Sequence, residues 1–142
     1  MLNLSIWAFI ADAYTPLLVV FSLFTLVKQP NQSTFKSSIG LLLSVCFIYG
    51  LMWLDKTLEI WSQFELDYST HTALALVFVV FLSLNSIKTL LFSALSILLY
   101  AALMMTLQYH TLLDILTTAL AVTPVVWWLQ RTFIIKINEH NH

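Results

Sequence analysis

Two histidines and one aspartate stand at the edges of long apolar segments of this chain. His71 lies in "YSTHTALA", and His110 and Asp114 lie four residues apart in "YHTLLD". If a helix begins at or before His110, the pair shares one face, and the carboxylate holds one imidazole nitrogen as a donor while the other stays nucleophilic. His71, arriving from another helix, would protonate the leaving group. The pattern predicts phosphoryl transfer through a phosphohistidine.

Each of these residues also has a structural interpretation. A single histidine inside a membrane commonly forms a helix–helix hydrogen bond, and this alternative stands equally for His71 and His110. A buried acid is harder to explain in that way, because an aspartate at the bilayer centre costs about 2.5–3.5 kcal/mol. Asp114 therefore needs a partner, and His110 is the nearest one. We expect the pair to be functional, and its catalytic role is a further hypothesis.

Composition identifies the solvent of most of the chain as lipid. The 142 residues are 60% hydrophobic and 9% charged, with a mean hydropathy of +0.89. A water-soluble domain of this size carries far more polar surface. Two glycines, three prolines and no Gly- or Ser-rich stretch favour one integral membrane domain over residues 1–142, an all-α helix bundle. A net charge of -1 and the lack of a basic stripe argue against nucleic-acid binding.

The apolar runs predict about five transmembrane helices, since a crossing needs about 20 residues. The third run is the least secure because its uninterrupted apolar part is only about 15 residues long, so a four-span bundle is the alternative. The first run is not expected to be a cleavable signal peptide, because no basic residue precedes it and it contains Asp12. The five runs cover residues 4–27, 37–54, 68–85, 89–109 and 111–130.

Basic residues set the predicted orientation. Five of the six fall on one side of the predicted bundle, which the positive-inside rule makes cytoplasmic. The N-terminus is then outside, the C-terminus is cytoplasmic, and the three site residues lie near the outer face. This arrangement predicts a protein of a bacterial-type cytoplasmic (inner) membrane whose site faces the periplasm or exterior. The five basic residues are Lys28, Lys36, Lys88, Arg131 and Lys136.

Three segments resemble motifs of the type 2 phosphatidic acid phosphatase superfamily, whose members include membrane lipid phosphatases and sphingomyelin synthases. "YSTHTALA" is similar to the P-S-G-H motif, with Ser69 and His71 in place. "HTLLD" matches the end of S-R-x5-H-x3-D, and Lys56 matches the lysine of K-x6-R-P. The resemblance covers about residues 55–120. The arginines of the first and third motifs are replaced, and the residues at those positions are Gln63 and Met104.

The resemblance implies a role for each matching residue. His110 would attack phosphorus, Asp114 would orient it, and His71 would be the general acid. No metal and no cofactor are expected. Because both phosphate-binding arginines are replaced, the substrate would carry less charge, or the phosphate chemistry would have been lost. The residues expected to contact the substrate are Lys56, Ser69, Thr70 and Asp12.

Two of these contacts have simpler alternatives. Lys56 follows Asp55 and stands one turn from Glu59, so it is equally suited to a surface ion pair worth under about 1 kcal/mol. Ser69 precedes an apolar run and is well suited to cap a helix.

Three functions remain open. The first is an outer-leaflet lipid phosphatase or headgroup phosphotransferase acting on a phosphorylated membrane lipid. The second is a non-catalytic relative that binds a lipid or a protein partner. The third is a VanZ-like small membrane protein, suggested by "LDK" at residues 54–56. A homodimer or another membrane-protein partner is compatible with all three.

Overall fold

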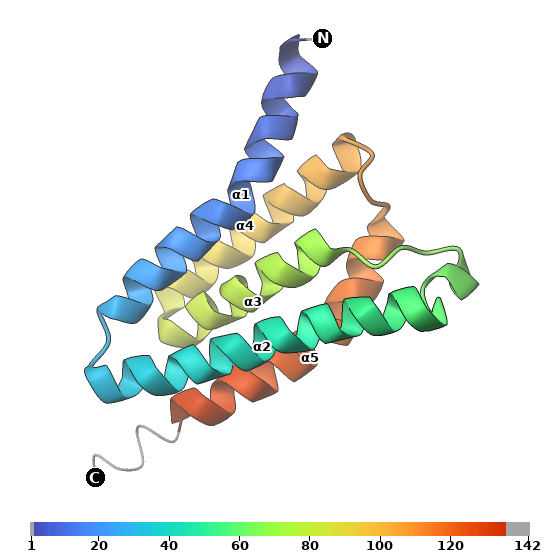
Figure 1. Cartoon of the computed structure of the whole chain (residues 1–142). Helices are drawn as coiled ribbons and strands as arrows, with labels where there is room; N and C mark the ends of the chain where they lie inside the picture. The colour runs from blue at the N-terminus through green and yellow to red at the C-terminus, as the bar shows by residue number, and fades with distance from the viewer. Residues whose placement is uncertain (1, 136–142) are drawn as a thin grey trace.

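The computed structural model describes residues 2–135, and this part of the chain is all-helical (Figure 1). A short 3-10 helix, η1 (Ser62–Phe64), lies in the longest connection. Lys136, which was predicted to lie on the cytoplasmic side, is outside the described residues. The histidines His140 and His142 are also outside them. The α-helices are α1 (Leu2–Val27), α2 (Asn31–Leu58), α3 (Thr70–Asn85), α4 (Ile87–Thr106) and α5 (Leu112–Ile135).

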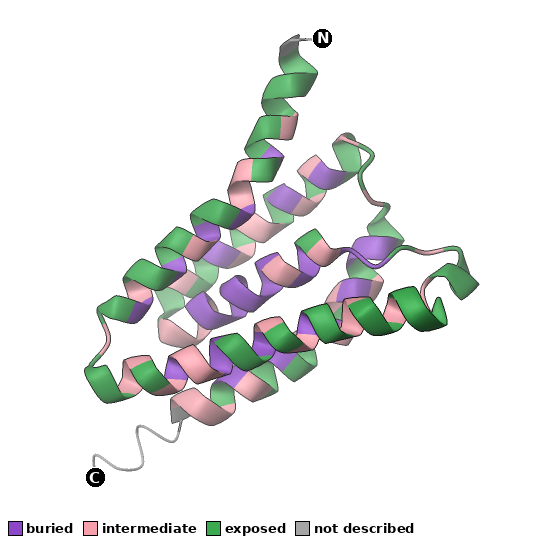
Figure 2. Ribbon diagram, in the orientation of Figure 1, coloured by how far each residue is buried: buried purple, intermediate pink, exposed green. Residues whose placement is uncertain are grey.

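Four of the helices are long and apolar enough to cross a membrane, namely α1, α2, α4 and α5. Their outer faces expose large apolar side chains, such as Phe9 at 72%, Leu98 at 68% and Leu120 at 75% (Figure 2). Apolar surface of this extent is unusual on a soluble monomer and natural in lipid. The structure therefore bears out an all-helical fold of the integral membrane type.

The third predicted span is the shorter helix α3, which forms the core of the bundle. Its 16 residues extend over about 24 Å. It packs against all four other α-helices and most of its residues are buried (Figures 1 and 2). A helix that is apolar on every side is expected to be enclosed by protein. Because its neighbours shield it from lipid, α3 does not need the length of an exposed span.

Several helix boundaries differ from the apolar runs. Helix α2 begins at Asn31, six residues before the predicted start, directly after Pro30, whose fixed φ suits a helix N-terminus. It ends at Leu58, and the following C-cap residue, Glu59, adopts a left-handed φ of 52°. Hydropathy marks only the lipid-facing part of such a helix, while its polar first and last turns continue the same hydrogen-bond ladder.

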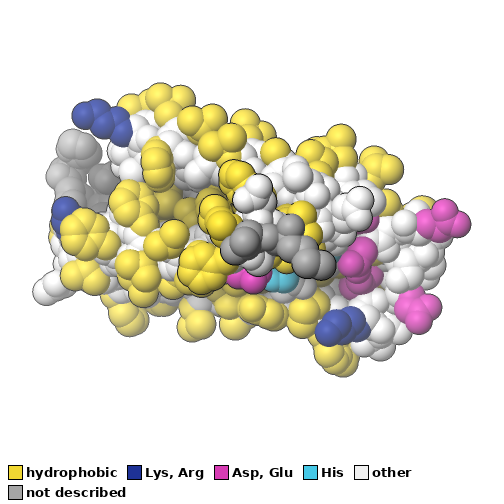
Figure 3. All heavy atoms as spheres, turned by 90° about the horizontal axis from the view of Figure 1, so that it is seen from above, with side chains coloured by type: hydrophobic (Ala, Val, Ile, Leu, Met, Phe, Trp, Pro, Cys, Tyr) yellow, Lys and Arg dark blue, Asp and Glu magenta, His cyan; other side chains and the backbone are white. Residues whose placement is uncertain are grey.

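The helices alternate in direction, so the bundle has two ends of opposite charge. One, the basic end, carries Lys28, Lys36, Lys88 and Arg131. The other, the acidic end, carries Asp55, Glu59, Glu65 and Asp67, with Lys56 among them. Figure 3 shows basic side chains at one end and acidic side chains toward the other, with one basic group among the acidic ones and a histidine beside acidic groups. This separation matches the predicted charge asymmetry.

Candidate functional site

The connection between α2 and α3 is held against the first turns of α5. The Asp114 carboxylate accepts hydrogen bonds from the N–H of Asp67 at 2.8 Å and from the N–H of Thr111 at 2.7 Å. The Thr118 hydroxyl accepts from the N–H of Ser69 at 3.1 Å. Since charged acceptors make the stronger backbone hydrogen bonds, Asp114 fixes the start of α3 relative to the start of α5.

Two aromatic residues, Trp61 and Tyr68, also hold the connection between α2 and α3 in place. The indole N–H of Trp61 donates to the Thr117 hydroxyl at 3.0 Å, and its ring packs edge-on against Tyr68 with centroids 5.1 Å apart. The Tyr68 hydroxyl donates to the Ile48 carbonyl at 3.1 Å. Burial raises the pKa of the Tyr68 phenol, with a smaller contribution from Asp55, so this donor keeps its proton. The connection between α2 and α3 is thus fixed by specific hydrogen bonds and ring packing.

His110 lies in the turn before α5 and not on the helix. Helix α5 begins at Leu112, so the condition that the helix starts at or before His110 is not met. Thr111 instead occupies the N-cap position: its hydroxyl accepts from the Asp114 N–H at 3.2 Å, while Asp114 accepts from the Thr111 N–H. This reciprocal capping pair is the common way to begin a helix. It presents His110 to Asp114 from the turn.

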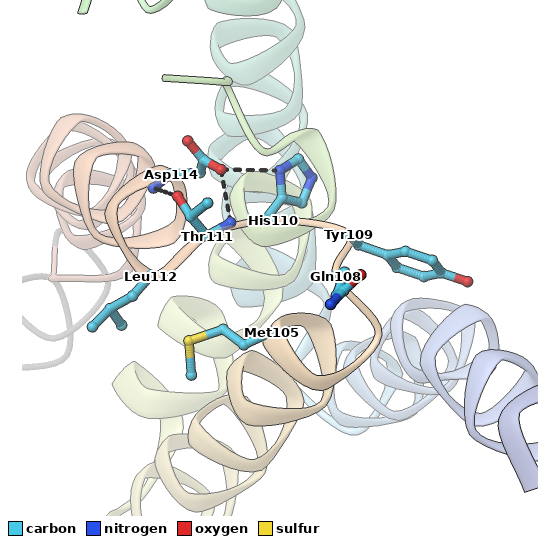
Figure 4. Close-up of a pocket in the computed structure, with 7 residues that line it drawn as sticks. All are labelled: Met105, Gln108, Tyr109, His110, Thr111, Leu112 and Asp114. Atoms are coloured by element: carbon cyan, nitrogen blue, oxygen red, sulfur yellow. Dashed lines mark hydrogen bonds and ion pairs between the residues drawn. The ribbon is translucent and has the colours of Figure 1, made fainter. Parts of the chain in front are cut away.

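One ring nitrogen of His110 faces two carboxylates. Its Nδ1 lies 3.9 Å from Asp114 Oδ2 and 3.7 Å from Asp67 Oδ2, and the dashed line in Figure 4 marks the first contact. The imidazole is 11% exposed, and within residues 2–135 its Nδ1 has no hydrogen-bond partner. In the neutral ring, two acceptors on this side favour the tautomer with its proton at Nδ1 and its lone pair at Nε2. Asp67 was not among the predicted site residues, although its position two residues before Ser69 was a usable signal.

The structure brings both histidines to one hollow at the acidic end. The hollow measures about 350 Å³ and is called the histidine hollow below. A second hollow of about 300 Å³ lies on the Asp114 side of His110, lined in part by Met105, Gln108 and Leu112 (Figure 4). The histidine hollow is lined by Asp12, His71, Tyr100, Met104, Tyr109 and His110.

The other predicted contact residues do not line this hollow. The Ser69 side chain is fully buried and caps α3: its oxygen accepts from the Thr72 N–H at 3.3 Å. Thr70 opens α3 and is half-buried. Lys56 is exposed near the end of α2, and no ion pair of Lys56 with Asp55 or Glu59 occurs in the described part of the chain.

Tyr100 and Tyr109 line the hollow and were not predicted. Tyr100 is buried in α4, where its ring stacks on Tyr14 of α1 at 4.2 Å. Tyr109 precedes His110 in the turn and is 46% exposed. The face of α4 that meets α1 depends on packing, so hydropathy alone held no signal for Tyr100. For Tyr109, adjacency to His110 was the only available signal.

No protein-family model, curated protein or solved structure matches the chain. Among the described residues, no group of three or more His, Cys, Asp or Glu side chains is arranged to hold a metal ion.

Proposed function

We propose that the protein is an integral membrane lipid phosphatase or headgroup phosphotransferase that works through a phosphohistidine at His110. The observation that carries this proposal is the histidine hollow, which both His71 and His110 line, together with the carboxylates that lie near Nδ1 of His110. An imidazole held in this way is a nucleophile at Nε2. The second imidazole, that of His71, lines the same hollow and can donate a proton to the leaving group.

The reaction takes two displacements at phosphorus. In the first, Nε2 of His110 attacks, the bond from phosphorus to the lipid alcohol oxygen breaks, and protonated His71 gives that oxygen its proton. In the second, water or another alcohol attacks the phosphohistidine, the P–N bond breaks, and His71 takes the proton of the attacking oxygen. Asp114 and Asp67 orient the His110 ring throughout. Water as the acceptor gives a phosphatase, and a lipid alcohol gives a phosphotransferase.

Backbone amides are the donors available for the phosphate oxygens. The first N–H groups of a helix have no partner within that helix, and a helix N-terminus attracts anions. Thr70 and His71 form the first turn of α3, next to the histidine hollow. None of the residues that line the hollow is Lys or Arg. This donor set is better suited to a phosphate that carries a single negative charge than to a dianionic phosphate monoester.

The orientation in the membrane follows from the charged ends. With the basic end in the cytoplasm, α3 passes through the bundle interior as a fifth crossing, and the histidine hollow opens toward the exterior face. A lipid of the outer leaflet would then present its head group to His110 while its chains stay beside the apolar outer faces of the long helices.

The proposal is tested by turnover of lipids with monoester, diester and diphosphate head groups, each paired with its 4-nitrophenyl analogue. The protein is purified in dodecyl maltoside. His110→Ala is expected to lower turnover of both members of the preferred pair by about 10³-fold or more. His71→Ala is expected to lose about 10²-fold on the lipid but far less on the analogue, because nitrophenolate leaves without a proton.

His140→Ala is the matched control, since it is the same chemical change outside the described residues. Turnover that persists in His110→Ala, or equal losses on the two leaving groups in His71→Ala, would contradict the assigned roles. A non-catalytic lipid-binding protein is the second candidate, favoured by the lack of Lys and Arg around the hollow. It predicts that no lipid of the panel is turned over while lipid binding survives in both histidine variants.

A further inference from the structure

The histidine hollow has lining residues that the proposed chemistry does not use. Besides the two histidines and Met104, it is lined by Asp12 from α1, Tyr100 from α4 and Tyr109 from the turn. Figure 4 shows the Tyr109 ring directed away from Asp114, toward the ribbon of α1. An acid and two aromatic rings thus share a hollow with the proposed nucleophile.

Asp12 lacks an internal cation. It belongs to a helix long and apolar enough to span a membrane, where an aspartate is costly without a partner. In the described part of the chain, the contacts between carboxylates and basic side chains all involve His110, and Asp12 takes part in none. Its side chain is exposed, and its nearest described surroundings in the hollow are aromatic or histidine side chains and Met104. The Asp12 carboxylate is therefore free to pair with a cation that a ligand brings into the hollow.

Aromatic rings beside a carboxylate are the usual recognition elements for alkylammonium groups. The ring faces attract the cation through their quadrupole, and the carboxylate neutralises it. Tyr109 supplies an accessible ring, 46% exposed, and Tyr100, which is buried and stacked on Tyr14, contributes to the wall of the hollow. Lys or Arg side chains, which would repel such a ligand, do not line the hollow.

We propose that Asp12, Tyr100 and Tyr109 bind the alkylammonium group of a zwitterionic phospholipid head group, of the choline or ethanolamine phosphodiester kind. The inference rests on the proposed function, because it places the phosphate of the same head group at His110. A dianionic phosphate monoester would meet Asp12 with no cation to offset the repulsion. A zwitterionic diester carries one negative charge on its phosphate and brings its own cation. Its phosphate would lie at His110 and its alkylammonium group at Asp12.

The test measures binding without turnover. Tetramethylammonium, phosphocholine and inorganic phosphate are titrated against the full-length protein in dodecyl maltoside, which contains no choline, and binding is followed by ligand-observed NMR. Asp12→Asn keeps the side-chain shape and removes the charge, and it is expected to weaken tetramethylammonium binding by about tenfold. Glu65→Gln, the same change on an exposed acid outside the hollow, is expected to alter it less than about twofold.

The aromatic contribution is tested in the exposed turn, where a substitution does not disturb the core. Tyr109→Phe keeps the ring and is expected to retain binding, whereas Tyr109→Leu is expected to weaken it about three- to fivefold. Absence of tetramethylammonium binding by the wild-type protein, or equal binding by wild type and Asp12→Asn, overturns the inference.

The outcome for the head-group site is separable from the outcome for the reaction. His110→Ala is expected to bind tetramethylammonium as the wild type does, although it no longer turns lipid over. Asp12-dependent binding without any lipid turnover would support this site and contradict the proposed reaction. Turnover of a lipid phosphate monoester without tetramethylammonium binding would support the reaction and contradict this site.

Discussion

Polar side chains gather at both ends of the bundle, but they are used differently. At the basic end, the Gln29 amide donates to Asn85, and its oxygen accepts from Ser33 and Ser37. The Asn85 amide in turn donates to the Phe81 carbonyl at 2.7 Å. This network is closed and ties the α1–α2 connection to the end of α3. Such a network is expected to stabilise the fold without offering groups to a ligand.

The acidic end contains polar side chains whose hydrogen-bonding or ion-pairing groups have no partner in the described part of the chain. Within residues 2–135, the buried Nδ1 of His110 has no hydrogen-bond partner, and Asp12 contacts no basic side chain. The difference follows from the connections: α1–α2 and α3–α4 are short, whereas residues 59–69 and 107–111 form longer segments with many backbone groups to satisfy. Asp114 meets that demand and holds His110 in place at the same time. The His110 imidazole and the Asp12 carboxylate line the same hollow, so both are available to a ligand there.

Removal of the Asp114 carboxylate is expected to have the largest effect of any change at either end. Asp114→Ala leaves the N–H groups of Asp67 and Thr111 without their acceptor and releases His110. We expect a loss of about 10³-fold in turnover together with about 2–4 kcal/mol in the free energy of unfolding. Turnover assays and SDS-induced unfolding measure the two losses.

Asp114→Asn is the matched variant, and it keeps one of the two oxygens that accept backbone N–H groups while its amide NH2 faces the other N–H. It is expected to recover part of the stability but little of the turnover, because an amide does not stabilise an imidazolium. Full activity in Asp114→Asn would remove the electrostatic role assigned to this side chain.

The two ends are expected to lie on opposite sides of the membrane. In a Cys46→Ser background, Glu65→Cys at the acidic end should react with a membrane-impermeant maleimide on intact cells. Lys88→Cys at the basic end should react at least about tenfold less until the membrane is permeabilised. Both positions are exposed, so burial does not account for a difference. Equal labelling of both before permeabilisation would contradict the orientation.

Opening the network at the basic end is expected to cost stability alone. Gln29→Ala removes the partner of Asn85, Ser33 and Ser37, so the free energy of unfolding should fall by about 1–2 kcal/mol. Turnover per folded molecule should stay within about twofold, because the network does not reach the histidine hollow. A selective loss of turnover at unchanged stability would break the contrast between the two ends.

The smallest effect is expected for Gln130, which lies between the ends. It is 1% exposed, donates to the Val77 carbonyl at 2.9 Å, and has an unpaired side-chain oxygen within the described part of the chain. Gln130→Leu loses two neutral hydrogen bonds, to the Val77 carbonyl and the Ser44 hydroxyl, but also removes that buried unpaired oxygen, so we expect a net change of about 1 kcal/mol or less in the free energy of unfolding. A loss of several kcal/mol would assign Gln130 to an essential network.

Much of the fold was accessible from hydropathy and charge. The apolar runs located the five α-helices of the described residues, four of which are long enough to cross a membrane. A helix that faces lipid, or one that is enclosed by protein as α3 is, must be apolar and must satisfy its own backbone. The His110–Asp114 spacing placed the two side chains near each other although the helix begins later than the prediction required. The predictions for Lys56 and Ser69 depended on motif positions, and packing directs these side chains to the surface and to a helix cap.

By itself, the sequence determined the solvent of this protein, the helical segments and the separation of charge between the ends. These follow from local composition, since transfer of each segment into lipid depends on its own residues. Only the tertiary structure decided that α3 is the enclosed core helix, that Asp67 joins Asp114 at His110, and that Asp12 and two tyrosines complete the hollow. Those contacts join residues far apart in the chain, and their positions depend on how helix faces pack together.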